Sequence, residues 1–196
     1  MEARKESHDW QQADYAGAWM AKNQQRTERR SALLARMLAE APFAADAPLR
    51  VLDVGGGYGF VSQAVLTAFP KATVTLQDFS QPMIDQALIY LTPYAGRMRF
   101  ALSDLRDPAW SKGMGPFDLV VSAIAIHNLR DVAAMAACYG AIRALLVPGG
   151  LFLDCDHLDK AGGTARHVEM LREAGFKSVT ALAGDDEHTP ILKAQA

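Results

Sequence analysis

The stretch Gly55–Gly59, which reads Gly-Gly-Gly-Tyr-Gly, has the residue types best suited to ligand binding. Glycines permit a tight turn and let a ligand approach the backbone closely. The spacing fails the dinucleotide fingerprint G-x-G-x-x-G, because Phe60 or Ser62 takes the place of the third glycine. No Gly-Lys-Ser/Thr follows, so the stretch is not a P-loop either. The sequence therefore predicts a loop that holds a ligand other than a tightly bound pyrophosphate.

Two imidazoles are candidates for proton transfer. His127 lies in an Ala-Ile-His-Asn-Leu stretch, and His157 directly follows Asp156 as an acid–imidazole pair. Histidine changes its charge near neutral pH, which makes it a common proton acceptor in catalysis. Two plainer interpretations stay open, namely that His127 only hydrogen-bonds a loop and that Asp156-His157 is an exposed turn. Neither group has the spacing of metal ligands, so the sequence predicts no metal site.

Short apolar stretches alternate with segments of helical spacing and would position these residues. The expected strands are 50–54, 73–77, 98–102, 117–123, 150–154, 178–182 and 189–194, and the expected helices are 58–69, 81–92, 131–146 and 164–174. Apolar strands between helices are typical of parallel sheets buried on both faces. The sequence thus predicts an α/β, doubly wound, mostly parallel seven-stranded sheet. The short turn before the last strand predicts that this strand is antiparallel.

The chain divides into two predicted parts. Residues 1–41 form an N-terminal helical cap, and residues 49–196 form a Rossmann-like domain after a Pro/Ala linker. Ser80 and Asp131 are suited to cap the helices that follow them. Pro190 is compatible with the last strand only as its first residue, because proline donates no hydrogen bond to a sheet.

The pattern D-x-G-x-G-x-G that begins at Asp53 resembles motif I of the class I S-adenosylmethionine-dependent methyltransferases of small-molecule type. Three further stretches are similar to later motifs of that family: Phe117–Ser122, Leu146–Phe152 and Leu171–Phe176. The resemblance covers roughly residues 50–180. It implies in-line transfer of a methyl group from S-adenosylmethionine to a small-molecule acceptor, with S-adenosylhomocysteine as product and no metal.

The same resemblance implies where the cofactor binds. The glycine loop would hold the methionine end, Asp78 the ribose hydroxyls, and Asp104 the exocyclic amine of adenine. The residues implied at the cofactor are Asp53, Gly55, Gly56, Gly57, Tyr58, Asp78, Phe79, Met83, Ser103, Asp104, Leu105, Ser122 and Ala123. Plainer interpretations are a loop cap for Asp53, solvated turns for Asp78 and Asp104, and core packing for the apolar side chains.

The acceptor is expected beside Tyr15, Trp19, His127 and His157, with His127 as a candidate general base. Tyr15 and Trp19 are four residues apart and share a helix face, where they would cover the cofactor or only dock the helix. Related enzymes carry a longer segment than 157–163 after the fifth strand. The acceptor site is therefore open, covered by the N-terminal helices alone, or completed by a partner subunit in a homodimer.

Composition and charge limit the partners. The 20 Lys+Arg against 22 Asp+Glu disfavour binding to nucleic acid through bulk charge. The Asn/Asp-Pro-Pro-aromatic motif of nucleic-acid methyltransferases is also missing after the fourth strand. The basic run of Arg26, Arg29 and Arg30 is expected to be a solvated helix face. No apolar stretch is long enough to span a membrane, and no secretory signal is visible, so a cytoplasmic protein is expected.

Two other function classes stay open. One is a non-catalytic module that binds S-adenosylmethionine or S-adenosylhomocysteine in order to sense it or to regulate a partner. The other is a nicotinamide-dependent oxidoreductase, which the failed glycine fingerprint weakens. Cys138 and Cys155 are too few for a disulfide framework.

Overall fold

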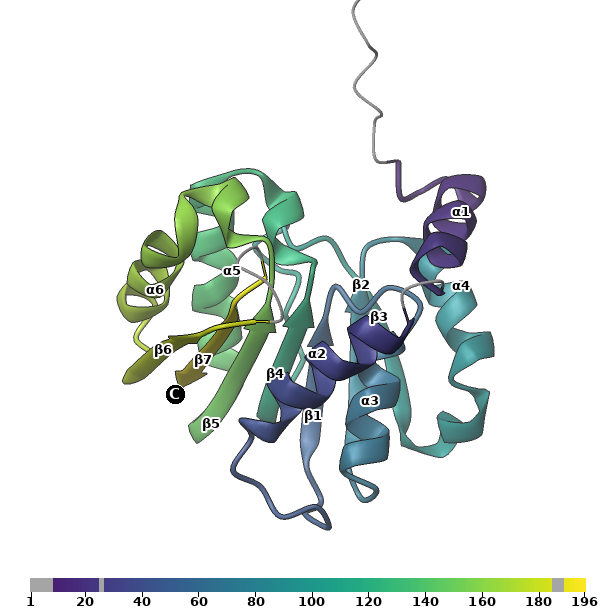
Figure 1. Ribbon diagram of the computed structural model, residues 1–196, viewed down its shortest axis with the longest axis horizontal. Coiled ribbons are helices and arrows are strands. Elements are labelled where there is room, and N and C mark those ends of the chain that lie inside the picture. Colours follow the sequence, from purple (N-terminus) through teal and green to yellow (C-terminus); the bar gives the residue numbers. More distant parts are fainter. Residues whose placement is uncertain (1–8, 25–26, 185–188) are drawn as a thin grey trace, which may run out of the picture.

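A computed structural model describes residues 9–24, 27–184 and 189–196 as an α/β structure (Figure 1). The strands are β1 (Arg50–Val54), β2 (Thr73–Asp78), β3 (Met98–Leu102), β4 (Phe117–Ala123), β5 (Leu146–Cys155), β6 (Ser178–Leu182) and β7 (Ile191–Gln195). The α-helices are α1 (Ala13–Gln24), α2 (Thr27–Ala39), α3 (Phe60–Ala68), α4 (Gln81–Tyr90), α5 (Val132–Leu145) and α6 (Gly163–Glu173). Short 3-10 helices are η1 (Thr92–Arg97), η2 (Ile126–Leu129) and η3 (Leu158–Ala161).

The strands form one sheet in the order β3-β2-β1-β4-β5-β7-β6. β7 is antiparallel to both β5 and β6, and the other pairs are parallel, as the sequence predicts. Pro190 precedes the first residue of β7 and so removes no hydrogen bond from the sheet. The chain order reverses between β1 and β4. In such sheets ligands bind outside the carboxyl ends of the strands at that reversal.

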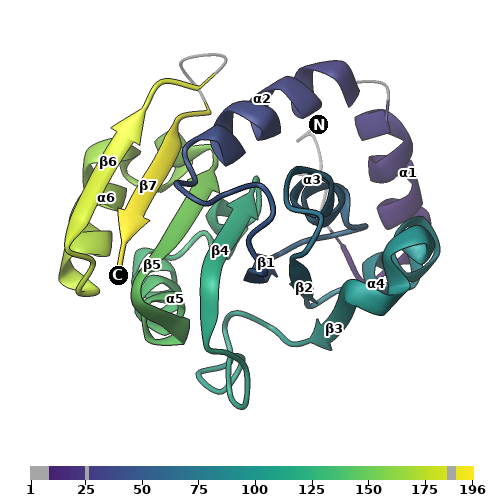
Figure 2. The same ribbon diagram turned by 90° about the horizontal axis from the view of Figure 1, so that it is seen from below.

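Helices cover both faces of the sheet (Figure 2). Alternate residues of a strand point to opposite faces, so Val51 packs in the core with α2 and α3, whereas Leu52 packs in the core with α5 and α6. The buried side chains Leu34 and Met37 of α2 belong to the first of these cores. α4 packs separately on β2 and β3.

Most of the predicted boundaries follow from local caps. The Ser80 hydroxyl accepts from the Met83 N–H at 3.2 Å, and the Asp131 carboxylate accepts from the Ala134 N–H at 2.7 Å. Several boundaries differ from the prediction by one or two residues, and the start of β5 differs most. The sequence places the strand at 150–154, but β5 begins at Leu146, because this residue already pairs with Phe117 before the register shifts.

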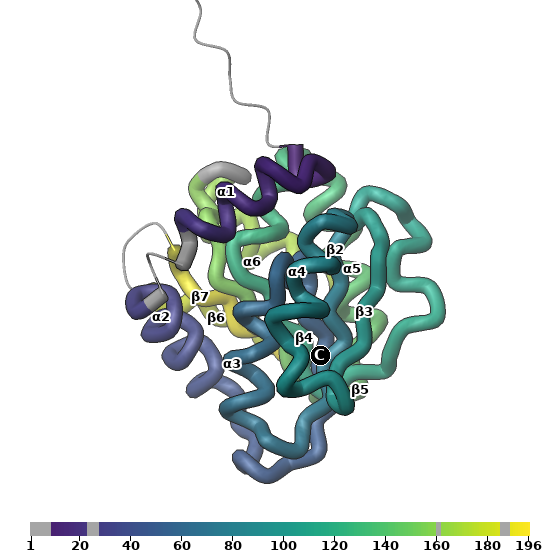
Figure 3. Tube along the Cα trace, turned by 90° about the vertical axis from the view of Figure 1, so that its right-hand side faces the viewer, coloured from purple at the N-terminus to yellow at the C-terminus, as the bar shows by residue number. Residues whose placement is uncertain are grey.

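The N-terminal residues are less uniformly helical than predicted. Residues 9–12 form a turn ahead of α1, and residues 1–8 and 25–26 lie outside the described part of the chain. α1 lies at the same end of the sheet as the carboxyl ends of β1 and β4, where it contacts α4 (Figure 3). Its buried Ala16 packs with Tyr58 and Met83 instead of with the two main cores. No helix in the described ranges is long and apolar enough to cross a membrane.

Candidate functional site

The glycine loop joins β1 to α3 and is fixed to the end of β2. The Gly55 N–H donates to Gln77 Oε1 at 3.1 Å, and the Gly57 N–H donates to Asp78 Oδ2 at 2.9 Å. Gly55 has a φ of +64°, and an added Cβ would lie 2.5 Å from the Cβ of Ala125. Only glycine therefore fits where this loop meets the segment after β4.

Asp53 lies beneath the loop and supports it. Its carboxylate accepts from the Ser62 hydroxyl at 2.7 Å and is fully buried. Burial is the main cause that raises its pKa to about 7, and the charge of Asp78 adds to this effect, while Ser62 opposes it. Asp53 does not line either cavity described below.

The buried carboxyl of Asp53 predicts a pH-dependent effect on stability. Its folded-state pKa of about 7 lies above its ordinary value of 3.8. The contribution of the neutral carboxyl to the free energy of unfolding is therefore fully present below about pH 4 and is lost as the pH rises through 7. Asp53→Asn removes this ionisation. Between pH 5 and pH 8, the free energy of unfolding of the variant should gain about 2–3 kcal/mol relative to the wild type. Urea titrations at both pH values measure this, and a pH-independent difference would contradict it.

Two adjoining cavities open at the carboxyl ends of the strands. The first has a volume of about 90 Å³ and is lined by Trp10, Trp19, Arg30, Gly55, Gly56, Gly57, Tyr58, Phe60, Val61, Asp78, Phe79, Met83, Leu105, Ala123, Ile124, Ala125 and Asn128. The second has a volume of about 380 Å³ and is lined by Trp10, Phe79, Asp104, Leu105, Arg106, Ala125, Asn128, Leu129 and Arg130. The shared residues make the two cavities parts of one cleft. They are Trp10, Phe79, Leu105, Ala125 and Asn128.

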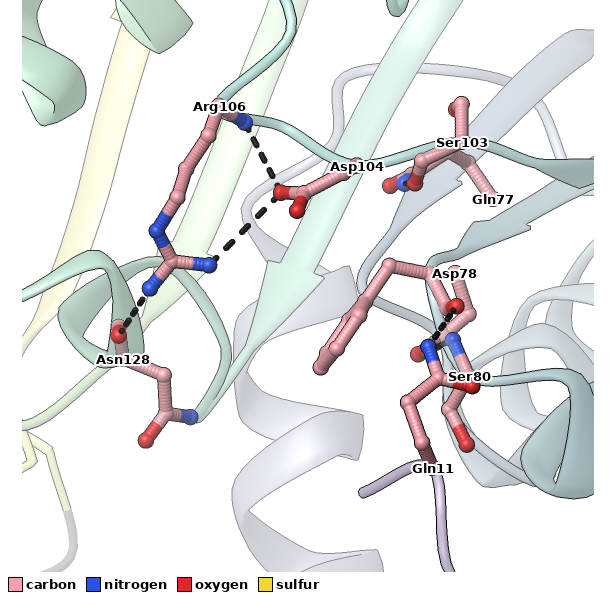
Figure 4. Close-up of polar contacts among 9 residues, drawn as sticks. Gln11, Gln77, Asp78, Ser80, Ser103, Asp104, Arg106 and Asn128 are labelled. Atoms are coloured by element: carbon pink, nitrogen blue, oxygen red, sulfur yellow. Dashed lines mark hydrogen bonds and ion pairs between the residues drawn. The ribbon is translucent and has the colours of Figure 1, made fainter. Parts of the chain in front are cut away.

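Asp78 is the carboxylate of the first cavity. Besides the Gly57 contact, its Oδ1 accepts from the Ser80 N–H at 2.8 Å (Figure 4). Burial is the main cause that raises its pKa, and these backbone donors oppose that effect. The same side chain thus holds the glycine loop and faces the cleft.

Asp104 is the carboxylate of the second cavity, and Arg106 holds it in place (Figure 4). Asp104 Oδ1 accepts from the Arg106 N–H at 2.9 Å and lies 3.6 Å from Arg106 Nη1. Arg106 Nη2 donates to the carbonyl of Asn128 at 3.2 Å. Arg106 therefore connects the segment after β3 to the segment after β4 across the cavity.

The turn at residues 9–12 closes the cleft on the side of β2. Gln11 Nε2 donates to the carbonyl of Phe79 at 2.7 Å, and the Ser80 hydroxyl donates to the carbonyl of Trp10. The ring of Trp10 packs edge-on against Tyr15 and Trp19, with centroids 5.0 and 5.2 Å apart. Tyr15 thus supports Trp10 and does not itself line the cleft, whereas Trp10 and Trp19 do.

His127 pairs with a buried acid from the end of β5. Its Nδ1 lies 2.5 Å from Asp156 Oδ1, and its backbone N–H donates to Asp156 Oδ2 at 2.9 Å. The sequence suggests instead that Asp156 pairs with His157. In the structure His157 donates its backbone N–H to Asp156 at 2.8 Å, and its ring packs edge-on against His127. With Nδ1 held by a carboxylate, Nε2 of His127 is the nitrogen that can accept a proton.

The cleft brings together many of the predicted residues. Those lining it are Trp19, Gly55, Gly56, Gly57, Tyr58, Asp78, Phe79, Met83, Asp104, Leu105 and Ala123. Those outside its lining are Tyr15, Asp53, Ser103, Ser122, His127 and His157. Ser103 and Ser122 have buried hydroxyls that find no hydrogen-bond partner among the described residues. Trp10, Arg30, Arg106 and Asn128 line the cleft without having been predicted at the cofactor.

A metal site is not evident in the described part of the chain, where His, Cys, Asp and Glu side chains form no group of three or more that could hold an ion. The cleft is instead built from glycine backbone, aromatic rings and two carboxylates. This combination suits an organic ligand with both apolar surface and hydroxyl or amino donors.

The sequence is similar to known methyltransferases. The family described as "Methyltransferase domain" matches residues 51–150. A malonyl-[acyl-carrier protein] O-methyltransferase of Magnetococcus marinus is 34% identical over 83 residues, which cover 42% of this chain and 30% of that protein. A trans-aconitate 2-methyltransferase of Streptomyces avermitilis is 35% identical over 97 residues, which cover 48% of this chain and 35% of that protein. The chain thus matches about a third of the length of these curated relatives.

Solved structures share the fold. An O-methyltransferase family protein from Burkholderia thailandensis superposes with a TM-score of 0.73 at 20% identity, covering 96% of this chain and 60% of that one. A SAM-dependent methyltransferase from Aquifex aeolicus superposes with a TM-score of 0.68 at 16% identity, covering 83% of this chain and 88% of that one. At these identities the likeness shows the fold alone.

Proposed function

Because this chain belongs to the methyltransferase domain family, we propose that it transfers a methyl group from S-adenosylmethionine to a small-molecule acceptor. The observation that carries the proposal is the cleft itself. A glycine loop and the carboxylates of Asp78 and Asp104 line it at the carboxyl ends of the strands. The His127–Asp156 pair lies outside this lining but at the same end of the sheet, after β4 and β5. Membership of this family also counts against the alternative that the protein is a nicotinamide-dependent oxidoreductase.

The residues of the cleft fit this cofactor. Gly57 has a φ of +55° and lines the first cavity, and an added Cβ would meet only Met83 Sδ, at 3.9 Å. Glycine therefore keeps room there for a ligand against the backbone. Asp78 would accept the two ribose hydroxyls, while Asp104, held by Arg106, would accept the amine of adenine. Phe79 lines both cavities and would pack against the nucleoside between them.

The bound cofactor would supply a methyl group already activated on a sulfonium, so the protein's part is mainly to position the acceptor and to exclude water. A base is needed only where the acceptor keeps its proton at neutral pH. We propose that Nε2 of His127 takes that proton and that Asp156 stabilises the resulting imidazolium.

The histidine–aspartate pair favours one class of acceptor. Two relatives are named for malonyl-[acyl-carrier protein] and trans-aconitate, both of which carry carboxylates. A carboxylate is already ionised at neutral pH and needs no base. A buried acid paired with an imidazole is useful when the acceptor is a hydroxyl group or an acidic carbon. We therefore propose that the acceptor atom is the oxygen of a hydroxyl group or an acidic carbon, and that His157 and Trp19 lie near it.

Two measurements test the proposed function. Calorimetry with S-adenosylhomocysteine reports whether the cleft binds the nucleoside. Incubation with S-adenosylmethionine and a panel of phenols, enols and carboxylic acids, followed by mass spectrometry, reports transfer. Binding without transfer to any acceptor would favour the non-catalytic binding module. Absence of binding would contradict both the methyltransferase and the binding module.

A cytoplasmic location and a homodimer stay predictions of the sequence.

The cover formed by the N-terminal segment gives a separate prediction. Removing residues 1–22 should leave the sheet folded, because the core contacts of α2 lie at Leu33 and beyond. It should weaken binding of S-adenosylhomocysteine roughly tenfold or more, since Trp10 and Trp19 no longer cover the cleft. Circular dichroism checks the fold, and calorimetry measures the affinity. Unchanged affinity and turnover would show that these rings only dock the helix.

A further inference from the structure

Arg30 of α2 is a charged side chain that lines the cleft, although the sequence predicts a solvated helix face for it. Of the basic run, Arg26 lies outside the described residues and Arg29 is exposed. Arg30 turns inward and lines the first cavity together with the glycine loop. Among the residues that line this cavity, all of them within the described ranges, Arg30 is the only cation and Asp78 the only anion.

Aromatic side chains hold the Arg30 guanidinium in place. Its Cζ lies 4.7 Å from the ring centroid of Phe60, 5.7 Å from that of Trp19 and 6.0 Å from that of Tyr58. Arg30 Nη1 donates to the Tyr58 hydroxyl at 3.1 Å. Such stacking orients a guanidinium and displaces water around it, which strengthens its attraction for an anion.

We infer that Arg30 binds the carboxylate of the amino-acid end of the cofactor, an inference that rests on the proposed function. Tyr58 and Phe60, which contact the guanidinium, belong to the glycine loop and to the start of α3. This is the part of the cleft left for the amino-acid end once the nucleoside lies between Asp78 and Asp104.

Charge and geometry both support this orientation. A ligand carboxylate beside Asp78 would meet a like charge, whereas beside Arg30 it meets an opposite one. A guanidinium has five donors in a planar fork, and the bond to Tyr58 uses one of them. The fork therefore keeps the donors needed for a bidentate contact with a carboxylate.

The experiment compares two ligands and three variants. The ligands are S-adenosylhomocysteine and its analogue that lacks only the carboxylate. The variants are Arg30→Met, which keeps an unbranched apolar stem but no charge, Arg30→Lys, which keeps the charge, and Arg36→Met as control. Arg36 lies on the same helix but is exposed and donates to the carbonyl of Gly184, away from the cleft.

Arg30→Met should weaken the binding of S-adenosylhomocysteine roughly 10-fold to 100-fold and leave the binding of the decarboxylated analogue nearly unchanged. Arg30→Lys should restore part of the loss, and Arg36→Met should bind like the wild type. The wild type should also prefer S-adenosylhomocysteine to the analogue by a similar factor, which tests the inference even if Arg30→Met fails to fold.

Two results would overturn the inference alone. One is an Arg30→Met variant that binds S-adenosylhomocysteine like the wild type. The other is an equal loss for both ligands, which would mean that Arg30 only packs the aromatic side chains around it. A wild-type protein that binds neither ligand would instead contradict the proposed function, and the inference with it.

Discussion

The His127→Asn variant is expected to transfer methyl groups at least about 10²-fold more slowly than the wild type, the usual share of general-base catalysis. Its affinity for S-adenosylhomocysteine should stay nearly the same, because His127 lies outside the lining of the cleft. Stopped assays with a hydroxyl acceptor measure the rate, and calorimetry measures the affinity.

The outcome separates catalysis from binding. A raised KM with an unaltered kcat would mean that His127 only contacts the acceptor. An unaltered rate with a hydroxyl acceptor would remove His127 from the mechanism. A carboxylate acceptor serves as an internal control, because it has no proton to lose at neutral pH and its methylation should be much less sensitive to the variant.

The Asp78→Ala variant should lose most of its affinity for S-adenosylhomocysteine, roughly 10²-fold or more. Two causes add up. The proposed contact with the ribose hydroxyls is charge-assisted, and each such bond contributes roughly 1.5–3 kcal/mol. The same carboxylate also accepts from the backbone of Gly57 and Ser80, so its removal loosens the loop against which the ligand binds.

Asp85→Ala is the matched control for this prediction, since Asp85 is an exposed carboxylate of the nearby helix α4 and does not line the cleft. Asp78→Asn separates the two causes, because its amide oxygen can still accept from one backbone N–H while the charge is lost. Calorimetry measures the affinities, and thermal denaturation confirms folding. Wild-type affinity in a folded Asp78→Ala variant would contradict the assignment of the ribose site.

The sheet could be predicted from the sequence because its signals are local. β1 and β4 carry buried apolar residues on both faces, for example Val51 and Leu52 in β1 and Val120 and Val121 in β4. Glycine or a capping residue marks where helices begin and end. The start of β5 could not be predicted, because Pro148-Gly149-Gly150 is typical of a turn, whereas Leu146 pairs with Phe117 of another strand. Pairing across the sheet decided this boundary, and a local pattern does not contain it.

The site could be predicted only where it lies on the backbone of one loop or at the end of one strand. Gly55 and Asp78 are of this kind. The partner of His127 could not be predicted, because Asp156 reaches it from another strand, 29 residues away. The place of Arg30 in the cleft could not be predicted for a similar reason, since a helical basic run does not reveal which of its arginines turns towards the aromatic residues of another element.

The contacts of Asp156 also bear on how the activity could change during evolution. This one carboxylate accepts from the ring and the backbone of His127 and from the backbone of His157, so it joins the segments after β4 and β5. Replacing His127 costs a proton acceptor, whereas replacing Asp156 leaves two backbone donors without their acceptor. Proteins that evolve from this one and methylate acceptors needing no base can therefore lose His127 before they lose Asp156. We expect an acidic residue at position 156 to outlast a histidine at position 127.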